Sequence, residues 1–267
     1  MADSRFTTHA DLFALRGKNA LVTGGTKGIG MMIARGLLQA GARVIISARK
    51  ADTCAEAQRL LSEFGDVQAI PADLSTHDEC RRLADLVQAD SERLDILVNN
   101  AGAMWREPLE TFPDEAWDTV LDLNLKSPFW LVQALLPALR RAGTAEDPAR
   151  VINIGSIAAI HVADSPNYSY ASSKAGLHQL TRVLARELGP QHVTVNAVAP
   201  GPFPSQMMAT TLEAVGETIA AKAPLRRLGR DDDMAGIAVF LAGRAGAYLT
   251  GTVIPVDGGI ATTATGT

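Results

Sequence analysis

The stretch Thr23-Gly24-Gly25-Thr26-Lys27-Gly28-Ile29-Gly30 decides how the rest of the sequence is interpreted. It follows the apolar run Asn19–Thr23, which is typical of a buried strand, and leads directly into a segment with helical periodicity. Gly24, Gly28 and Gly30 would let backbone N–H groups at a helix N-terminus approach a phosphate with no Cβ in the way. A tight turn with surplus glycine is the alternative, but the position behind the first strand favours a phosphate-binding site.

Short apolar runs alternate with longer amphipathic segments along the chain, and strand-helix-strand alternation predicts a parallel sheet with helices on both faces. The expected strands are Asn19–Thr23, Arg43–Ala48, Val67–Ile70, Leu94–Val98, Val151–Gly155, Val193–Ala199 and Thr252–Val256. The expected helices include Ile29–Ala40, Asp78–Ala89, Ala116–Arg141 and Ser172–Leu188. We therefore predict an α/β fold with a Rossmann-type, doubly wound sheet of about seven strands, each buried on both faces.

The alternation runs on without a linker rich in proline, serine or glycine and without an internal repeat, so residues 1–267 are expected to form a single domain. We expect short flexible tails at residues 1–14 and 261–267. The segment at about residues 203–224 is expected to form a small helical lid over the substrate.

Composition excludes several classes of protein. The 25 Lys and Arg residues against 29 Asp and Glu residues give a net charge of −4, which disfavours nucleic acid as a partner. No run approaches the roughly 20 apolar residues that span a bilayer, so no membrane partner is expected. Cys54, Cys80 and the five scattered histidines lack metal-ligand spacing, which predicts no metal site and a cytoplasmic location.

The end of the second expected strand, Ser47-Ala48-Arg49-Lys50, indicates which dinucleotide would bind. In dinucleotide-binding folds an acidic residue usually stands there and binds the adenosine ribose. Here Arg49, together with Lys27 of the glycine stretch, would neutralise a 2′-phosphate from two sides. Arg49 and Lys50 could also be ordinary solvated surface charges. The absence of an acidic residue at the end of this strand nevertheless favours NADP(H) over NAD(H).

Tyr170 and Lys174 are four residues apart on an expected helix, so their side chains leave the same face. A phenol is a poor acid at neutral pH, because its pKa is about 10, and we expect the nearby ammonium to lower that pKa. Ser156 follows an expected strand, at the edge of the sheet where ligands bind. Each feature is commonplace alone, whereas their joint occurrence behind a glycine loop indicates a catalytic site.

From about Leu15 to Ile260 the sequence resembles the short-chain dehydrogenase/reductase family. The motifs that carry the resemblance are Thr23–Gly30, Asp73-Leu74, Asn99-Asn100-Ala101-Gly102, Asn124, Ser156, Tyr170 with Lys174, and Pro200-Gly201. Ser205 stands where the family often has threonine, and it keeps a hydroxyl for the nicotinamide carboxamide. The candidate cofactor-binding residues are Gly24, Thr26, Lys27, Gly28, Ile29, Gly30, Arg49, Asp73, Leu74, Asn100, Ala101, Gly102, Tyr170, Lys174, Pro200, Gly201, Phe203 and Ser205.

The resemblance implies hydride transfer between NADP(H) and a carbonyl carbon, with Tyr170 giving a proton to the carbonyl oxygen. Ser156 would donate a hydrogen bond to the same oxygen. Lys174 would also hold the nicotinamide ribose, and Asn124 would position a water that leads protons to Lys174. Asn124, Ser156, Tyr170 and Lys174 are therefore the candidate catalytic residues.

Among family members the chain is most similar to 3-oxoacyl-thioester reductases, on Val193–Gly201 and Gly251–Gly259. The segments expected near the substrate are Met104-Trp105, Ile157–Tyr168, Phe203, Met207 and Met208. They are largely apolar, which suits an acyl chain carried on CoA or a carrier protein. A sugar or polyol dehydrogenase, or a non-catalytic NADP-binding sensor, are the alternatives. The resemblance also implies a homotetramer, joined in part through the apolar stretch at Phe129–Val132.

Overall fold

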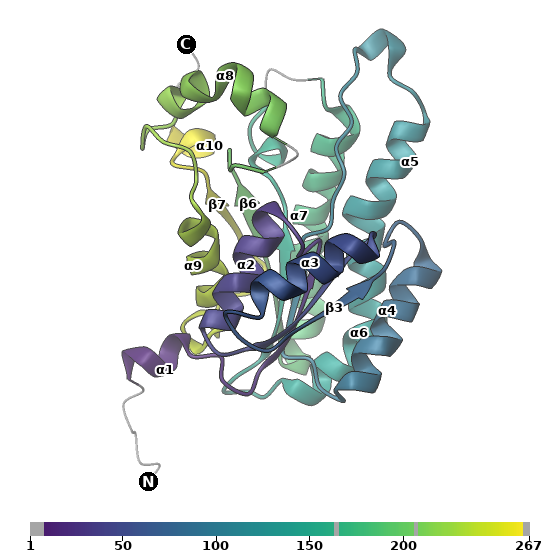
Figure 1. Cartoon of the computed structure of the whole chain (residues 1–267), viewed down its shortest axis with the longest axis vertical. Coiled ribbons are helices and arrows are strands. Elements are labelled where there is room, and N and C mark those ends of the chain that lie inside the picture. Colours follow the sequence, from purple (N-terminus) through teal and green to yellow (C-terminus); the bar gives the residue numbers. More distant parts are fainter. Residues whose placement is uncertain (1–7, 163–165, 206–207, 264–267) are drawn as a thin grey trace.

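The computed structural model describes residues 8–162, 166–205 and 208–263. Its centre is one parallel sheet of seven strands in the order β3-β2-β1-β4-β5-β6-β7 (Figure 1). The strands are β1 (Asn19–Thr23), β2 (Arg43–Ala48), β3 (Val67–Pro71), β4 (Ile96–Asn99), β5 (Ala149–Ile154), β6 (Val193–Pro200) and β7 (Val253–Val256). The predicted α/β fold is confirmed. Met207 and residues 163–165, expected near the substrate, lie outside the described residues.

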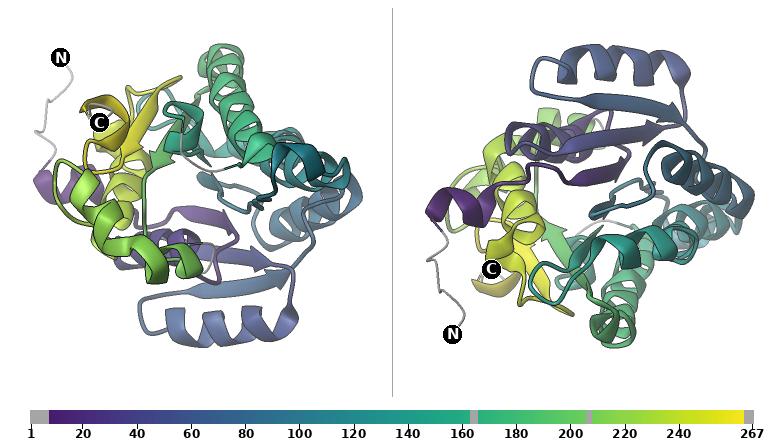
Figure 2. Two further views of the ribbon diagram at one scale, coloured as in Figure 1. Left: turned by 90° about the horizontal axis from the view of Figure 1, so that it is seen from above. Right: turned by 90° about the horizontal axis from the view of Figure 1, so that it is seen from below.

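Helices cover both faces of the sheet, as the two views of Figure 2 show. One face carries α2 (Gly28–Gln39), α3 (Ala51–Leu61) and α9 (Asp231–Ala242). The other carries α4 (His77–Asp90), α6 (Ser127–Ala142) and α7 (Tyr168–Leu188). The remaining α-helices are α1 (His9–Phe13), α5 (Glu115–Leu121), α8 (Ala209–Lys222) and α10 (Ile260–Thr263). None of the helices among the described residues is long and apolar enough to cross a membrane.

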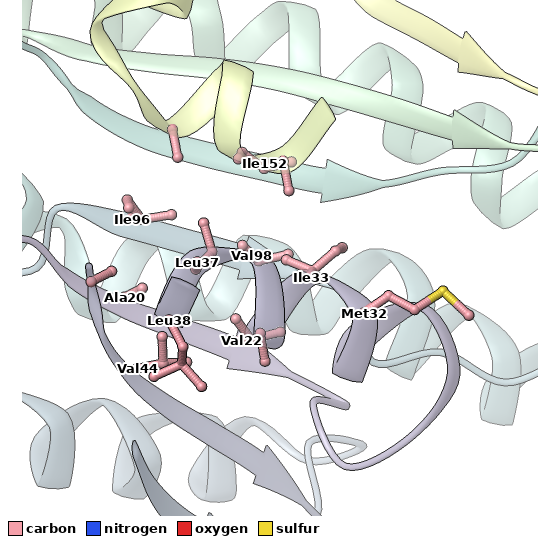
Figure 3. Packing of buried hydrophobic residues seen from close by; sticks show 14 of the residues in the cluster. Ala20, Val22, Met32, Ile33, Leu37, Leu38, Val44, Ile96, Val98 and Ile152 are labelled. Atoms are coloured by element: carbon pink, nitrogen blue, oxygen red, sulfur yellow. The ribbon is translucent and has the colours of Figure 1, made fainter. Parts of the chain in front are cut away.

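The alternation of side chains along each strand builds two cores. Val22 of β1 belongs to the core under α2, whereas its neighbour Leu21 belongs to the core on the opposite face. In Figure 3 the α2 side chains Ile33 and Leu37 lie beside Val22 and Val98 of the adjacent strands. Because every inner strand feeds both cores, β-branched and aliphatic residues fill it almost without interruption.

The structure corrects the expected burial of the edge strands. All side chains of β4, β5 and β6 are buried, but β3 has one exposed and two half-buried residues, and β7 is half-buried throughout. These two strands have a neighbour on one side only, so solvent reaches them. The helices α3 and α9 cover one face of the sheet together with α2.

Both segments expected to be flexible tails contain short helices. The N-terminal one holds α1, where Thr8 accepts a hydrogen bond from Asp11 N and Asp11 reciprocates with the backbone N–H of Thr8. This reciprocal cap satisfies amide groups that would otherwise need water. The C-terminal one holds the end of α10.

Candidate active site

Strand order decides where the site lies. β1 pairs with β2 on one side and β4 on the other, so the chain changes direction across the sheet at β1. Loops after β1 and β4 diverge at this point, and such a switch point at the carboxyl edge is where ligands bind in open α/β sheets.

The glycine loop has the shape of a phosphate cradle. Gly24 and Gly28 have φ values of 64° and 52°, which favour glycine strongly. A Cβ on Gly24 would stand 2.8 Å from Asn100 Nδ2, and one on Gly30 would overlap the Gly24 carbonyl oxygen. α2 starts at Gly28, and its N-cap residue Lys27 makes no side-chain hydrogen bond to the first-turn amides. The loop therefore fits a pyrophosphate at a helix N-terminus.

Thr23 and Asn100 tie the glycine loop to the loop after β4. Thr23 Oγ1 accepts hydrogen bonds from Asn100 N (2.9 Å) and Ala101 N (3.0 Å). Asn100 Nδ2 in turn donates to the carbonyl oxygens of Thr23 (2.9 Å) and Gly24 (3.1 Å). These four hydrogen bonds join the two loops that carry the candidate residues into one wall. The sequence reasoning gave Thr23 no role in holding this wall.

The candidate residues on the adenosine side come from the ends of β2 and β3. Arg49 is exposed directly after β2, just before α3. Asp73 is exposed as well, and its Oδ1 accepts a hydrogen bond from Ser75 N at 3.2 Å. Leu74, by contrast, is 3% exposed and belongs to the core under α4. Its side chain therefore packs in the core and is not available to contact a cofactor.

Asn124 is held in an unusual turn. The helical segment predicted over Ala116–Arg141 is found as α5 and α6, which are joined without a break by a π-turn at Asp122–Lys126 that the periodicity did not predict. The Asn124 amide is fully buried at the centre of this turn, where it accepts from Ala103 N (2.8 Å) and donates to Ala103 O (2.9 Å) and Ser173 Oγ (3.0 Å). The widened turn brings the amide within reach of the β4 loop.

Ser156, Tyr170 and Lys174 meet at the carboxyl end of β5. Ser156 lies beside Tyr170, and its hydroxyl acts to lower the pKa of the phenol. Ser156 Oγ also accepts from Ala158 N at 3.1 Å, which fixes its direction. Lys174 Nζ lies 5.7 Å from the centroid of the Tyr170 ring and donates to the Ile154 carbonyl oxygen at 2.8 Å. The predicted trio is thus brought together from β5 and one face of α7.

Burial dominates the charge states of this trio. It raises the pKa of Tyr170, and the Ser156 hydrogen bond and the charge of Arg106 oppose that rise. Burial therefore outweighs the lowering expected from Lys174, whose ammonium lies over the ring and donates to the β5 backbone, and the net direction of the Tyr170 pKa is upward. Burial also lowers the pKa of Lys174, from 10.5 to about 8.

The loop after β6 closes the site from the other side. Pro200 ends β6, and Gly201 packs so tightly on Asp257 that a Cβ there would stand 2.6 Å from the Asp257 Cβ. Ser205 faces the glycine loop, because a Cβ added to Gly28 would stand 3.2 Å from the Cβ of Ser205. Phe203, expected to line the substrate site, is 2% exposed in the core under α2, so its side chain cannot do so.

Three further residues near Ser156, Tyr170 and Lys174 were not among the candidates predicted from the sequence. Ser173 supports Asn124, as above. His178 lies one turn beyond Lys174, is buried, and crowds Gly155 so closely that a Cβ there would overlap its ring. Arg106 acts electrostatically on Tyr170 and contacts α8. Only Arg106 had a readable signal in the sequence, as a basic residue that follows directly on the expected substrate segment Met104-Trp105.

The chain matches a family model described as Enoyl-(Acyl carrier protein) reductase over residues 24–261. The chain belongs to the short-chain dehydrogenase/reductase family. This confirms the resemblance drawn from the motifs, and it identifies the chain as an oxidoreductase of that family.

Two relatives of this short-chain dehydrogenase/reductase come from Pseudomonas aeruginosa. The rhamnolipids biosynthesis 3-oxoacyl-[acyl-carrier-protein] reductase is 54% identical over 92% of this chain and 97% of its own. The 3-oxoacyl-[acyl-carrier-protein] reductase FabG is 36% identical over 92% of this chain and 98% of its own. A solved structure, the Pseudomonas aeruginosa RhlG/NADP active-site complex, has a TM-score of 0.90 at 54% identity and covers 94% of this chain and 98% of that chain.

Proposed function

We propose that this short-chain dehydrogenase/reductase uses NADPH to reduce the ketone of a 3-oxoacyl thioester to a secondary alcohol. The observation that carries the proposal is the convergence of the buried side chains of Ser156, Tyr170 and Lys174 at the carboxyl end of β5, with the ammonium of Lys174 over the phenol ring. Two hydroxyl groups beside each other can both donate hydrogen bonds to a carbonyl oxygen, and these bonds stabilise the negative charge that develops on that oxygen.

The cofactor would lie along the wall built by the loops after β1, β4 and β6. We assign its pyrophosphate to the backbone of the glycine loop, because Gly24 and Gly28 have positive φ values there and α2 begins at Gly28. Arg49 would bind the 2′-phosphate, and Asp73 lies beyond it on the adenosine side. Ser205, which faces Gly28, would hold the nicotinamide end. When bound, NADPH supplies the hydride.

Tyr170 is the general acid of the proposed reaction. Its raised pKa keeps the hydroxyl protonated at neutral pH, so it arrives at the ketone with a proton to give. On substrate binding, the neighbouring hydroxyl groups of Ser156 and Tyr170 would both donate hydrogen bonds to the ketone oxygen. The proton passes from Tyr170 to the new alkoxide. Tyr170 is left as a phenolate, and the ammonium of Lys174 lies over its ring.

Lys174 supports this step in two ways. Its charge stabilises the phenolate through the ring face, which is the electron-rich side of the phenol. Its hydrogen bond to the Ile154 carbonyl oxygen ties α7 to β5, and this fixes the distance between Tyr170 and Ser156. Asn124 in the π-turn donates a hydrogen bond to Ser173 on α7, which fixes the same part of α7.

The substrate class rests on the relatives and on the apolar mouth of the site. Both Pseudomonas aeruginosa relatives are 3-oxoacyl-[acyl-carrier-protein] reductases. Met104, Trp105 and Met208 are half-buried, and long flexible side chains of this kind accommodate acyl chains. We therefore place a 3-oxoacyl thioester ahead of a sugar or polyol, with the acyl group carried on CoA or a carrier protein.

The test is a comparison of substrates with the purified protein. Oxidation of NADPH and of NADH would be followed with a 3-oxoacyl thioester, a simple ketone and a ketose. The proposal expects the highest kcat/KM with the thioester and NADPH. A ketose that outperforms the thioester would support the sugar dehydrogenase instead, and no turnover with any substrate would support a non-catalytic NADP-binding sensor.

We further propose a homotetramer. Phe129 on α6 is 40% exposed and Val183 on α7 is 52% exposed, so two long neighbouring helices present apolar side chains. Light scattering after size-exclusion chromatography is expected to give four times the chain mass of 28.2 kDa. A monomer at micromolar concentration would contradict this proposal.

A further inference from the structure

Arg106 occupies an exposed position at the mouth of the candidate active site. It lies in the loop between β4 and α5, shortly after the wall formed by Asn100, Ala101 and Gly102. Its guanidinium reaches across to α8, which lies at the top of Figure 1. Nη1 is 3.5 Å from Thr211 Oγ1, and Nη2 is 3.8 Å from Met208 Sδ. Arg106 therefore bridges the two sides of the opening.

The partners of this guanidinium are poor ones. An arginine usually forms short, paired hydrogen bonds with a carboxylate, whereas a hydroxyl at 3.5 Å and a thioether at 3.8 Å are weak acceptors. Within the part of the chain that the structure describes, Arg106 makes no ion pair. Its donors thus remain available for a stronger acceptor that enters the site.

The charge of Arg106 acts on the pKa of Tyr170. It is one of two influences that oppose the rise in the pKa of Tyr170, the other being the Ser156 hydrogen bond. The guanidinium therefore lies within electrostatic range of the phenol. An acceptor held by Arg106 would belong to the same part of the substrate as the ketone.

We propose that Arg106 determines specificity by donating hydrogen bonds to the second carbonyl oxygen of the substrate, the thioester carbonyl two carbons from the ketone. This inference rests on the proposed function. A 3-oxoacyl thioester offers one oxygen to Ser156 and Tyr170 and a second oxygen nearby, whereas a simple ketone offers only the first. Arg106 would leave Thr211 and Met208 for that second oxygen.

CoA and carrier proteins offer another acceptor, the phosphate of the pantetheine arm. That phosphate is separated from the ketone by the whole arm, so it cannot lie beside Arg106 while the ketone lies at Tyr170. We therefore assign the thioester oxygen, and the substrates of the test distinguish the two acceptors.

The test compares three substrates with one acyl chain in common: a 3-oxoacyl N-acetylcysteamine thioester, the corresponding CoA thioester, and a 2-alkanone of equal length. In Arg106→Gln we expect kcat/KM with both thioesters to fall by about 10- to 100-fold, the worth of a hydrogen bond to a charged group. The kcat/KM with the 2-alkanone should fall far less, because there only the charge that acts on Tyr170 is lost, and Arg106→Lys should restore part of the thioester loss. Arg59→Gln, a change of the same kind on the exposed end of α3, should alter none of the three.

Each other outcome overturns a definite statement. An equal loss with the 2-alkanone would show that Arg106 only holds α8 in place. A loss confined to the CoA thioester would assign the phosphate instead, and no loss at all would remove Arg106 from substrate binding. In each case the wild-type protein still reduces the thioesters, so the proposed function stands. A wild-type protein that reduces no thioester overturns the proposed function itself, and this inference with it.

Discussion

Lys174 Nζ lies over the ring of Tyr170, 5.7 Å from its centroid, rather than beside its hydroxyl. The ammonium acts on the face of the phenol and on the backbone of β5, so it leaves the hydroxyl free for Ser156 and the substrate. This arrangement assigns separate tasks to the two residues. Tyr170 holds the proton that is transferred, and Lys174 stabilises what remains after the transfer.

The first prediction concerns the buried ammonium. Burial lowers the pKa of Lys174 from 10.5 in the unfolded chain to about 8 in the fold. The unfolded chain therefore binds more protons between these values, so the contribution of Lys174 to stability rises with pH across that window and is most unfavourable below it. Replacing the group should remove a cost of about 3 kcal/mol near pH 7.

We expect Lys174→Met to lose activity and yet unfold no more readily than the wild-type protein at pH 7, because it gives up one hydrogen bond to Ile154 but buries no charge. Its stability relative to wild type should decline as pH rises from 8 to 10.5. Urea unfolding of the cofactor-free proteins at several pH values measures this difference. A large loss of stability at pH 7 that does not vary with pH would contradict the assignment.

The second prediction concerns Gly155 and His178, which hold the catalytic serine loop. A Cβ on Gly155 would overlap the buried His178 ring, so Gly155→Ala should destabilise the fold by about 1–3 kcal/mol through overpacking. Ser156 follows directly, so kcat should fall as well. In a His178→Ala background the added methyl has room, and the cost should shrink. Equal costs in both backgrounds, measured by denaturant unfolding, would show that the two residues do not interact.

The third prediction concerns cofactor choice. Arg49→Asp places a carboxylate where the 2′-phosphate would bind, so KM for NADPH should rise by about 10- to 100-fold. KM for NADH should fall, because a carboxylate suits a free ribose hydroxyl. Steady-state kinetics with both cofactors measure the change. Arg59→Asp, at the far end of α3, is the matched control. An unchanged ratio of the two KM values would refute the role of Arg49.

The sequence predicts those parts of the fold and site that depend on local order. The glycine stretch, the alternation of strands and helices, and the helical spacing of Tyr170 and Lys174 are all set by neighbours along the chain, and each lies where it was expected. Strand ends differ by up to two residues, because the last ladder hydrogen bond depends on the neighbouring strand.

The parts that failed depend on contacts between distant segments. The π-turn at Asn124 exists because its amide meets the backbone of Ala103, which no periodicity reveals. Phe203 faces the core and not the substrate, because its side chain belongs to the cluster that contains the buried side chains of α9. The pKa shifts of Tyr170 and Lys174 follow from burial, and Arg106 joins the site only through its contact with α8.

In the proposed mechanism Tyr170 donates the proton that completes carbonyl reduction. The most direct measurement is NADPH oxidation by Tyr170→Phe with a 3-oxoacyl thioester, together with a fluorescence titration of NADPH binding. Removing one hydroxyl from a buried ring should lower kcat by about 10²- to 10⁴-fold and leave the Kd for NADPH unchanged, because the phenol ring and Lys174 stay in place. Undiminished turnover in Tyr170→Phe would contradict the mechanism.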